Sequence, residues 1–363
     1  MMDRMEASPG EASAFLGKSK AYENPMQGRK KEPAGDCPLI REAEMNEFSW
    51  NRRAFLLAGG AMGTAGIGAA LTGARAATRD GGAGTAHYVT GSPQPDLPPM
   101  EVTLPGAVAR LDGVDLWYWD TGGAGPAVVL LHPATGSGHV WGYQQAALSA
   151  AGYRVIGYSR RGHRGSSPVD PAAPGTGVED LRMLVDHLGL RDFHLVGTAA
   201  GGFLAGGFAL AQPERLKSLT IACSIVSVAD PQVRALVPWL YEAWWNALAH
   251  DLRELSPSYR ATNRAGHARW NELHDLSRGD NPEVNQPAGL VASLDTMARI
   301  TVPTQLIYGD ADLISPPPIA RKLQAAIPGS ALTILTECGH SAYWERPAAF
   351  NQALLDFFKR QAS

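Results

Sequence analysis

An alternation of short apolar runs with amphipathic segments constrains the fold of this chain more than any other feature. Ala127–Leu131 is apolar throughout, which is typical of a strand buried on both faces. Further strands are expected at 114–119, 153–158, 193–196, 216–222, 304–308 and 332–335. Helices are expected at 140–151, 178–188, 201–211, 317–326 and 348–358. Alternation of this kind predicts an α/β fold, with a mostly parallel central sheet and helices on both faces.

Composition narrows the class of protein. Hydrophobic residues make up 45% of the 363 residues and charged residues 18%, which excludes a disordered polyelectrolyte. The net charge of −3 gives no electrostatic case for nucleic acid as a partner. Three cysteines are too few for a disulfide framework in a chain of this length. Because there is no His-Glu-x-x-His motif or Cys/His cluster, we expect no metal and no cofactor.

The N-terminal part has the features of an export signal. Arg52 and Arg53 precede a Gly-rich apolar run at 58–71, and the small-residue stretch Ala74-Arg75-Ala76-Ala77, which contains an Ala-x-Ala pattern, follows that run. The paired arginines resemble a twin-arginine (Tat) signal, which implies folding before export to the periplasm or the cell exterior. A membrane anchor is the alternative, but the run is about 14 residues long, against roughly 20 needed to span a bilayer. We therefore predict no stable membrane insertion after cleavage.

The remaining boundaries follow from composition. Residues 1–44 are polar and aperiodic, so they are either a disordered extension or a sign that translation begins at Met45. Residues 45–77 are the predicted signal, and the Gly-, Ser- and Pro-rich residues 78–100 are a predicted linker. Residues 101–363 form one predicted domain. Its segment at about 225–299 interrupts the alternation with helical, Trp-rich sequence, which predicts a cap over the carboxyl ends of the strands.

Polar residues after three of the apolar runs indicate a catalytic site. Gly197–Gly202 follows the run at 193–196, Asp312 follows the one ending at 308, and His340 follows the one ending at 335. Open α/β sheets carry their chemistry at the carboxyl ends of strands. The chain order is a strand-to-helix elbow, then an acid, then a histidine. This is the order of an α/β-hydrolase.

From about Val102 to its end, the chain resembles α/β-hydrolases of the enol-lactonase, haloperoxidase and epoxide-hydrolase type. The resemblance implies a capped domain in which His340 is a general base, Asp312 orients it, and the backbone N–H groups of Ala134 and Ala200 form an oxyanion hole. The supporting motifs are Leu130-Leu131-His132-Pro133 with Gly136, Arg161-Gly162-His163 with Ser166, Gly201-Gly202 before Pro213-Glu214-Arg215-Leu216, Gly309-Asp310-Ala311-Asp312, and Gly339-His340.

The elbow departs from the pattern of that family. The family elbow reads Gly-x-nucleophile-x-Gly, and Gly197 and Gly201 place Ala199 at the nucleophile position. A methyl group cannot attack a carbonyl, so the ordinary serine mechanism is not available. Thr198 is expected to point elsewhere. Cys223 and Cys338 are expected to be small core residues that do not pair, because one strand should lie between theirs.

Two accounts of function remain open at this point. In the first, the protein is an exported hydrolase of a small apolar ester or lactone. Its serine has then been replaced by Ala199, naturally or by design, or His340 and Asp312 activate water or substrate directly. In the second, it is a catalytically dead binding protein for a small apolar ligand. In both, Trp239, Tyr241 and Trp245 of the cap are candidates to line an apolar pocket.

Overall fold

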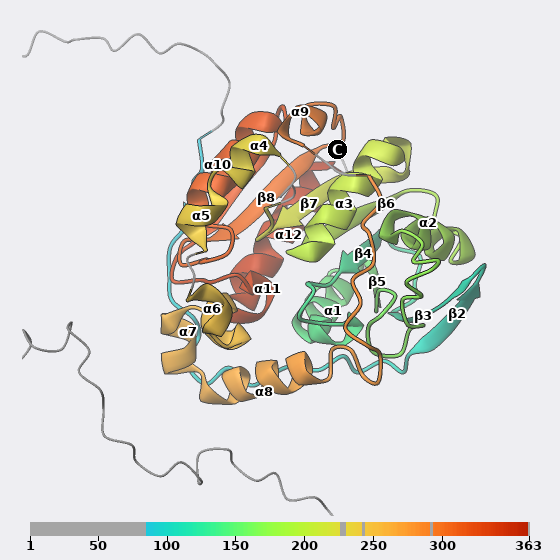
Figure 1. The fold of residues 1–363 in the computed structure, drawn as a ribbon, viewed down its shortest axis with the longest axis horizontal. Helices are drawn as coiled ribbons and strands as arrows, with labels where there is room; N and C mark the ends of the chain where they lie inside the picture. Colours follow the sequence, from blue (N-terminus) through green and yellow to red (C-terminus); the bar gives the residue numbers. More distant parts are fainter. Residues whose placement is uncertain (1–84, 226–229, 242–243, 291–292, 362–363) are drawn as a thin grey trace, which may run out of the picture. The chain divides into compact units, whose positions relative to one another are not determined.

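A nine-stranded sheet organises the described part of the computed structural model, which covers residues 85–225, 230–241, 244–290 and 293–361 (Figure 1). The strand order is β1-β9-β8-β7-β6-β4-β5-β3-β2, and the β2–β3 and β3–β5 pairs are antiparallel whereas the others are parallel. The strands are β1 (His87–Val89), β2 (Ala107–Leu111), β3 (Val114–Asp120), β4 (Ala127–Leu131), β5 (Arg154–Tyr158), β6 (Phe193–Thr198), β7 (Leu216–Ala222), β8 (Thr304–Gly309) and β9 (Ala331–Leu335). The predicted extension at 1–44 and signal at 45–77 lie outside the described residues.

The predicted fold class is confirmed. Every residue of β4, β6 and β8 is buried, as expected of strands covered on both faces. One layer of helices contains α1 (Gly142–Ala150), α11 (Ala342–Glu345) and α12 (Pro347–Gln361). The opposite layer contains α2 (Gly177–His187), α3 (Ala200–Ala211), α9 (Leu294–Met297) and α10 (Pro317–Ala326). Each layer closes its own hydrophobic core against the sheet, so the strand ends are held rigidly from both sides.

Of the segment predicted as a linker at 78–100, residues 85–100 take part in the domain, and residues 78–84 lie outside the described residues. β1 lies within this segment as an edge strand of the sheet and pairs with β9, with His87 opposite Thr333. Farther along, the Tyr143 hydroxyl donates to the Pro98 carbonyl at 2.8 Å. β1 has three largely exposed residues, so it has no apolar alternation that could distinguish it from a linker. Its order comes from backbone pairing at a sheet edge, which local sequence does not report.

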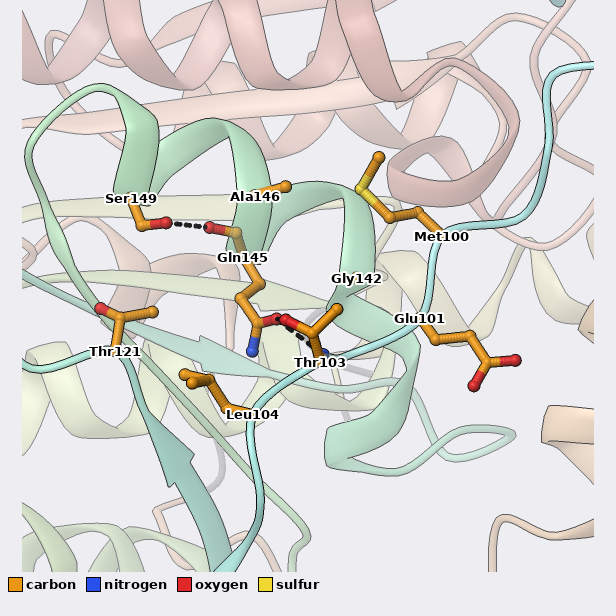
Figure 2. A pocket seen from close by; sticks show the side chains of 9 residues that line it. All are labelled: Met100, Glu101, Thr103, Leu104, Thr121, Gly142, Gln145, Ala146 and Ser149. Atoms are coloured by element: carbon orange, nitrogen blue, oxygen red, sulfur yellow. Dashed lines mark hydrogen bonds between the residues drawn. The ribbon is translucent and has the colours of Figure 1, made fainter.

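Residues 100–104, which come next in the chain, pack along α1 and leave a groove of about 280 Å³ (Figure 2). Gln145 of α1 accepts hydrogen bonds from the Thr103 amide at 2.9 Å and from its hydroxyl at 3.0 Å. Met100 and Leu104 line the same groove. The groove is lined by neither histidine nor cysteine and shares no lining residue with the cavity at Ala199 described below, so it does not belong to that site.

The cap is built from short pieces. They are α4 (Pro231–Arg234), α5 (Val237–Leu240), α6 (His250–Glu254), α7 (Pro257–Thr262) and α8 (Arg264–Asp275). Side-chain caps divide the later helices: Ser256 accepts from the Tyr259 amide before α7, and Asn263 accepts from the Gly266 amide before α8. No helix within the described ranges is long and apolar enough to cross a membrane. The end of α6 is bonded to the sheet domain, because the Glu254 carbonyl accepts from the His340 amide at 2.7 Å.

Candidate active site

The elbow between β6 and α3 keeps its strained shape without a nucleophile. Ala199 at its apex has φ +50° and ψ −116°, a region that non-glycine residues rarely adopt. Such a conformation costs about 1–3 kcal/mol and persists only where the surroundings enforce it. Here the Ala199 amide donates to the Ala222 carbonyl at 2.9 Å, and the Ser224 hydroxyl donates to the Ala199 carbonyl at 2.7 Å. The neighbouring strand therefore holds the apex in place.

Close backbone packing explains the glycines of the elbow. A Cβ on Gly197 would lie 2.3 Å from the Gly201 carbonyl oxygen, and one on Gly201 would lie 2.2 Å from the Leu131 carbonyl oxygen. Real Cβ atoms do not approach oxygens so closely. These two glycines are thus required by the contact between β6, α3 and β4, whatever the residue at the apex.

The acid and the histidine form a buried hydrogen-bonded pair. The Nδ1 atom of His340 lies 2.9 Å from Oδ2 of Asp312, and both side chains are almost completely buried. The amides of Ile314 and Ser315 each donate to Oδ1 of Asp312 at 2.8 Å, and the Ser315 hydroxyl donates to Oδ2 at 2.6 Å. Because Asp312 accepts the proton on Nδ1, the lone pair of His340 resides on Nε2.

Burial and charge act in opposite directions on this pair. Burial alone would lower the pKa of His340, but the Asp312 carboxylate, with Glu254 and Glu345, raises it above its usual value. Burial would raise the pKa of Asp312, yet the His340 charge and the bonds from His340 and Ser315 lower it. The pair is therefore an ionised carboxylate beside an imidazole of increased basicity, which suits a general base.

A third carboxyl fixes the loop that carries the histidine. Glu345 of α11 accepts from the Gly339 amide at 3.1 Å and from the Ser256 amide at 2.8 Å. Burial raises the pKa of Glu345 to about 7, although these hydrogen bonds oppose the shift. Glu345 thereby joins the histidine loop to the start of α7 in the cap.

A cavity of about 200 Å³ brings the predicted site residues together. Ala199, Ala200, Ala134 and His340 all line it, and Asp312 lies behind His340. The walls are otherwise mainly apolar. The remaining lining residues are Pro133, Thr135, Phe203, Cys223, Ser224, Ile225, Glu254 and Ile314.

Glu254 of α6 is a cavity residue that sequence reasoning missed. Its carboxylate accepts from the Thr135 hydroxyl at 3.0 Å, and burial raises its pKa although the nearby His340 charge lowers it. The available signal was an acidic residue within a Trp-rich cap segment, which is also the pattern of a solvated helix face. Only the tertiary fold distinguishes the two.

The cap aromatics lie elsewhere than expected. Trp239 is 84% exposed, and neither it, Tyr241 nor Trp245 is among the residues that line the cavity. Tyr241 approaches the site indirectly, because its hydroxyl donates to the carbonyl of the cavity residue Ile314 at 2.7 Å. Trp245 is buried in cap packing. The apolar wall is instead formed by Phe203, Ile225 and Ile314.

Neither of the two candidates considered from the sequence, Thr198 and Cys223, is placed to act as the nucleophile that Ala199 lacks. Thr198 is buried and does not line the cavity. Cys223 does line it, but burial raises the pKa of its thiol well above the usual value and its Sγ lies 3.8 Å from the Gly339 carbonyl oxygen. Cys223 and Cys338 are free, as predicted. No group of three or more potential metal ligands occurs within the described ranges.

Comparison with known proteins agrees with this architecture. Residues 128–353 match the model of the alpha/beta hydrolase family. The chain belongs to that family. A putative non-heme chloroperoxidase of Synechocystis is 30% identical, over 68% of this chain and 95% of the relative. A 2-hydroxy-6-oxononadienedioate/2-hydroxy-6-oxononatrienedioate hydrolase of Pseudomonas putida is 28% identical, over 68% of this chain and 92% of the relative.

Solved structures of other alpha/beta hydrolases have the same fold. A bromoperoxidase from Bacillus anthracis matches with a TM-score of 0.57 and 25% identity, covering 70% of this chain and all of that one. The enol-lactonase of Burkholderia xenovorans matches with a TM-score of 0.56 and 24% identity, covering 70% of this chain and all of that one. The relatives and this chain share a family whose named members include hydrolases of small molecules.

Proposed function

We propose that this protein hydrolyses a small, mainly apolar ester or lactone, and that His340 activates the attacking water directly. The observation that carries the proposal is the buried hydrogen-bonded pair of His340 and Asp312 beside a nucleophile position that holds only a methyl group. A family member that had kept only its pocket would have no need of a buried carboxylate held against an imidazole, because burying such a charge is costly. The apolar wall favours an apolar acyl group, and enol-lactonases among the structural relatives favour lactones as candidates.

The reaction needs only groups that face the cavity. With Nδ1–H bonded to Asp312, Nε2 of His340 takes a proton from water while the oxygen of that water attacks the carbonyl carbon. In this scheme the developing oxyanion is received by the N–H groups of Ala134 and Ala200, and the support for this assignment is that both residues line the cavity. When the intermediate collapses, His340 returns the proton to the leaving alkoxide, giving one carboxylic acid and one alcohol. No acyl-enzyme forms in this scheme.

Ala199 has a role in this mechanism. The elbow presents the residue at position 199 to the cavity, and a methyl group there occupies less space than a serine side chain. A water molecule can then occupy the position of the usual nucleophilic oxygen. The strained backbone keeps the amide of Ala200, the next residue, at the oxyanion position.

The experiment is the hydrolysis of p-nitrophenyl esters and γ-lactones by the parent protein and by the variant His340→Ala. We expect measurable parent turnover and a loss of about 10²–10⁴-fold in the variant, the usual contribution of a general base. His187→Ala, an exposed histidine on α2, is the matched control and should leave turnover unchanged. Ligand binding without parent turnover would support the alternative of a binding protein, which Ala199 favours, and would contradict the proposal.

We also propose that the protein is exported by the twin-arginine route and acts in the periplasm or outside the cell. The support is the pair Arg52–Arg53, the apolar run after it and the Ala-x-Ala pattern within Ala74-Arg75-Ala76-Ala77. Fractionation of cells that express the whole chain should place a shortened protein outside the cytoplasm. Replacing both arginines by lysine should retain the full-length protein in the cytoplasm.

A further inference from the structure

A second cavity, of about 340 Å³, adjoins the first. Ala134, Ala200 and Phe203 line both, so the two cavities are neighbours at these three residues. The second cavity differs in chemistry from the first, because Arg160, Arg161 and Arg278 line it and no Asp or Glu does. A molecule whose reacting group lies beside Ala199 can therefore extend into a region of positive charge.

Arg160 in this second cavity has a buried edge without a partner. Its Nε and Nη2 atoms have almost no contact with solvent and no hydrogen-bond partner among the described residues, although the side chain as a whole is partly exposed. Burial lowers the pKa of Arg160 to about 10, so the guanidinium remains charged at neutral pH. A charge held in this way is costly unless a ligand of opposite sign completes it.

Other arginines of this chain show what that edge is suited to bind. Arg161 holds Asp180 through Nε at 3.0 Å and Nη2 at 2.7 Å, and Arg154 holds Asp120 through the same two nitrogens at 3.1 and 2.6 Å. In each case one edge of the guanidinium bonds to both oxygens of a carboxylate. In Arg160 the same two nitrogens have no hydrogen-bond partner among the described residues.

Among the residues that the structure describes, no carboxylate is paired with Arg160. Arg161 is already paired with Asp180, and Arg278 donates to the carbonyls of Gly162 and Val284. His132 accepts the Arg160 amide at Nε2, at 2.9 Å, so its ring is neutral; burial lowers its pKa well below the usual value. Burial likewise lowers the pKa of His163, to about 3.

We propose that Arg160 binds a carboxylate on the substrate, at the end remote from the bond that is hydrolysed. The ester or lactone as the reacting group is taken from the proposed function, on which this proposal rests. The new element is the substrate class, an ester or lactone that carries a carboxylate several atoms from the scissile carbonyl. Arg278 adds positive charge to the same cavity, and Phe203 lies at the junction of the two cavities.

The proposed carboxylate site is tested by measuring the binding of ligands that the protein cannot hydrolyse as esters. The probes are adipic acid mono-N-methylamide, an anion at neutral pH, and N,N′-dimethyladipamide, its neutral counterpart; neither contains an ester. By titration calorimetry the parent should bind the anion at least about tenfold more tightly, as expected for hydrogen bonds to a charged group. Arg160→Gln should remove that difference. Arg110→Gln, which changes the net charge equally at an exposed site on β2, should preserve it.

Two further measurements separate recognition from folding and from adventitious anion binding. Arg160→Lys keeps the charge and should retain part of the preference, and Arg160→Gln should unfold at no lower temperature than the parent, because it removes an unpaired buried charge. Equal parent affinity for the two probes, or a preference that survives in Arg160→Gln, would overturn the proposal. So would inorganic phosphate binding more tightly than the monoamide. Anion preference without esterase turnover would support this site while contradicting the proposed hydrolysis.

Discussion

Two loops meet at the cavity, and they have kept different parts of a hydrolase site. The elbow between β6 and α3 retains its backbone strain, its close glycine contacts and its approach to the cavity, but it carries a methyl group at Ala199. The loop between β9 and α11 retains both its anchoring and its functional groups, since His340 is paired with Asp312 and supported by Glu345. Backbone packing at the elbow thus does not depend on the nucleophile, whereas the histidine loop keeps the hydrogen-bonded His340–Asp312 pair on which the proposed mechanism depends.

Of the changes considered below, restoring a nucleophile at position 199 should have the largest effect on ester hydrolysis. We expect Ala199→Ser to increase p-nitrophenyl ester hydrolysis by at least about 10³-fold, because removing the nucleophile from a comparable triad costs about 10⁶ in turnover. The elbow already has the required conformation, so no rearrangement is needed. Ala146→Ser, at an exposed position of α1, is the control and should have no effect. An unchanged rate in Ala199→Ser would mean that the elbow does not direct position 199 at a bound ester.

The acid of the pair should have the next largest effect. Asp312→Asn removes the charge that raises the pKa of His340 and no longer holds the proton on Nδ1. We expect parent turnover to fall by about 10²–10⁴-fold. Asp310→Asn, two residues away and exposed, should change it little. Equal losses in both variants would indicate a general disturbance of this loop.

The close backbone packing at the elbow should contribute to the stability of the folded protein. In Gly201→Ala the new Cβ would lie 2.2 Å from the Leu131 carbonyl oxygen, so we expect the free energy of unfolding to fall by about 1–3 kcal/mol in urea denaturation. Gly207→Ala is the control in the same helix, where the nearest atom to the new Cβ is a Val178 methyl at 3.1 Å. The gain in helix propensity should offset that milder contact. Similar losses at both positions would contradict the steric account.

Replacing the cap carboxyl Glu254 should have the smallest effect of these changes. We expect it to shift the pH dependence of kcat. Glu254 raises the pKa of His340, so Glu254→Gln should lower that pKa. Because the base acts when His340 is neutral, the rise of kcat with pH should then occur at lower pH than in the parent. Glu272→Gln, on the exposed face of α8, should leave the profile unchanged. A shift to higher pH in Glu254→Gln would show that the carboxyl does not act through its charge.

The sequence was informative where local pattern and chain order coincide. The apolar runs located the inner strands, and the polar residues after them located Asp312, His340 and the elbow. Local sequence does not reveal β1, which depends on pairing with β9 at a sheet edge. Nor does it reveal Glu254 and Arg160, whose roles depend on burial imposed by distant segments. Trp239 shows the converse: a large aromatic residue expected at the pocket is exposed.

The pre-steady-state release of p-nitrophenol tests the central claim most directly. If His340 activates water without a covalent intermediate, the parent should release p-nitrophenol linearly, and its intact mass during turnover should be unchanged. Ala199→Ser, measured in parallel, should give an initial burst approaching one equivalent and an acylated mass. A burst or an acyl adduct on the parent protein would contradict the account, because it would reveal a nucleophile other than water.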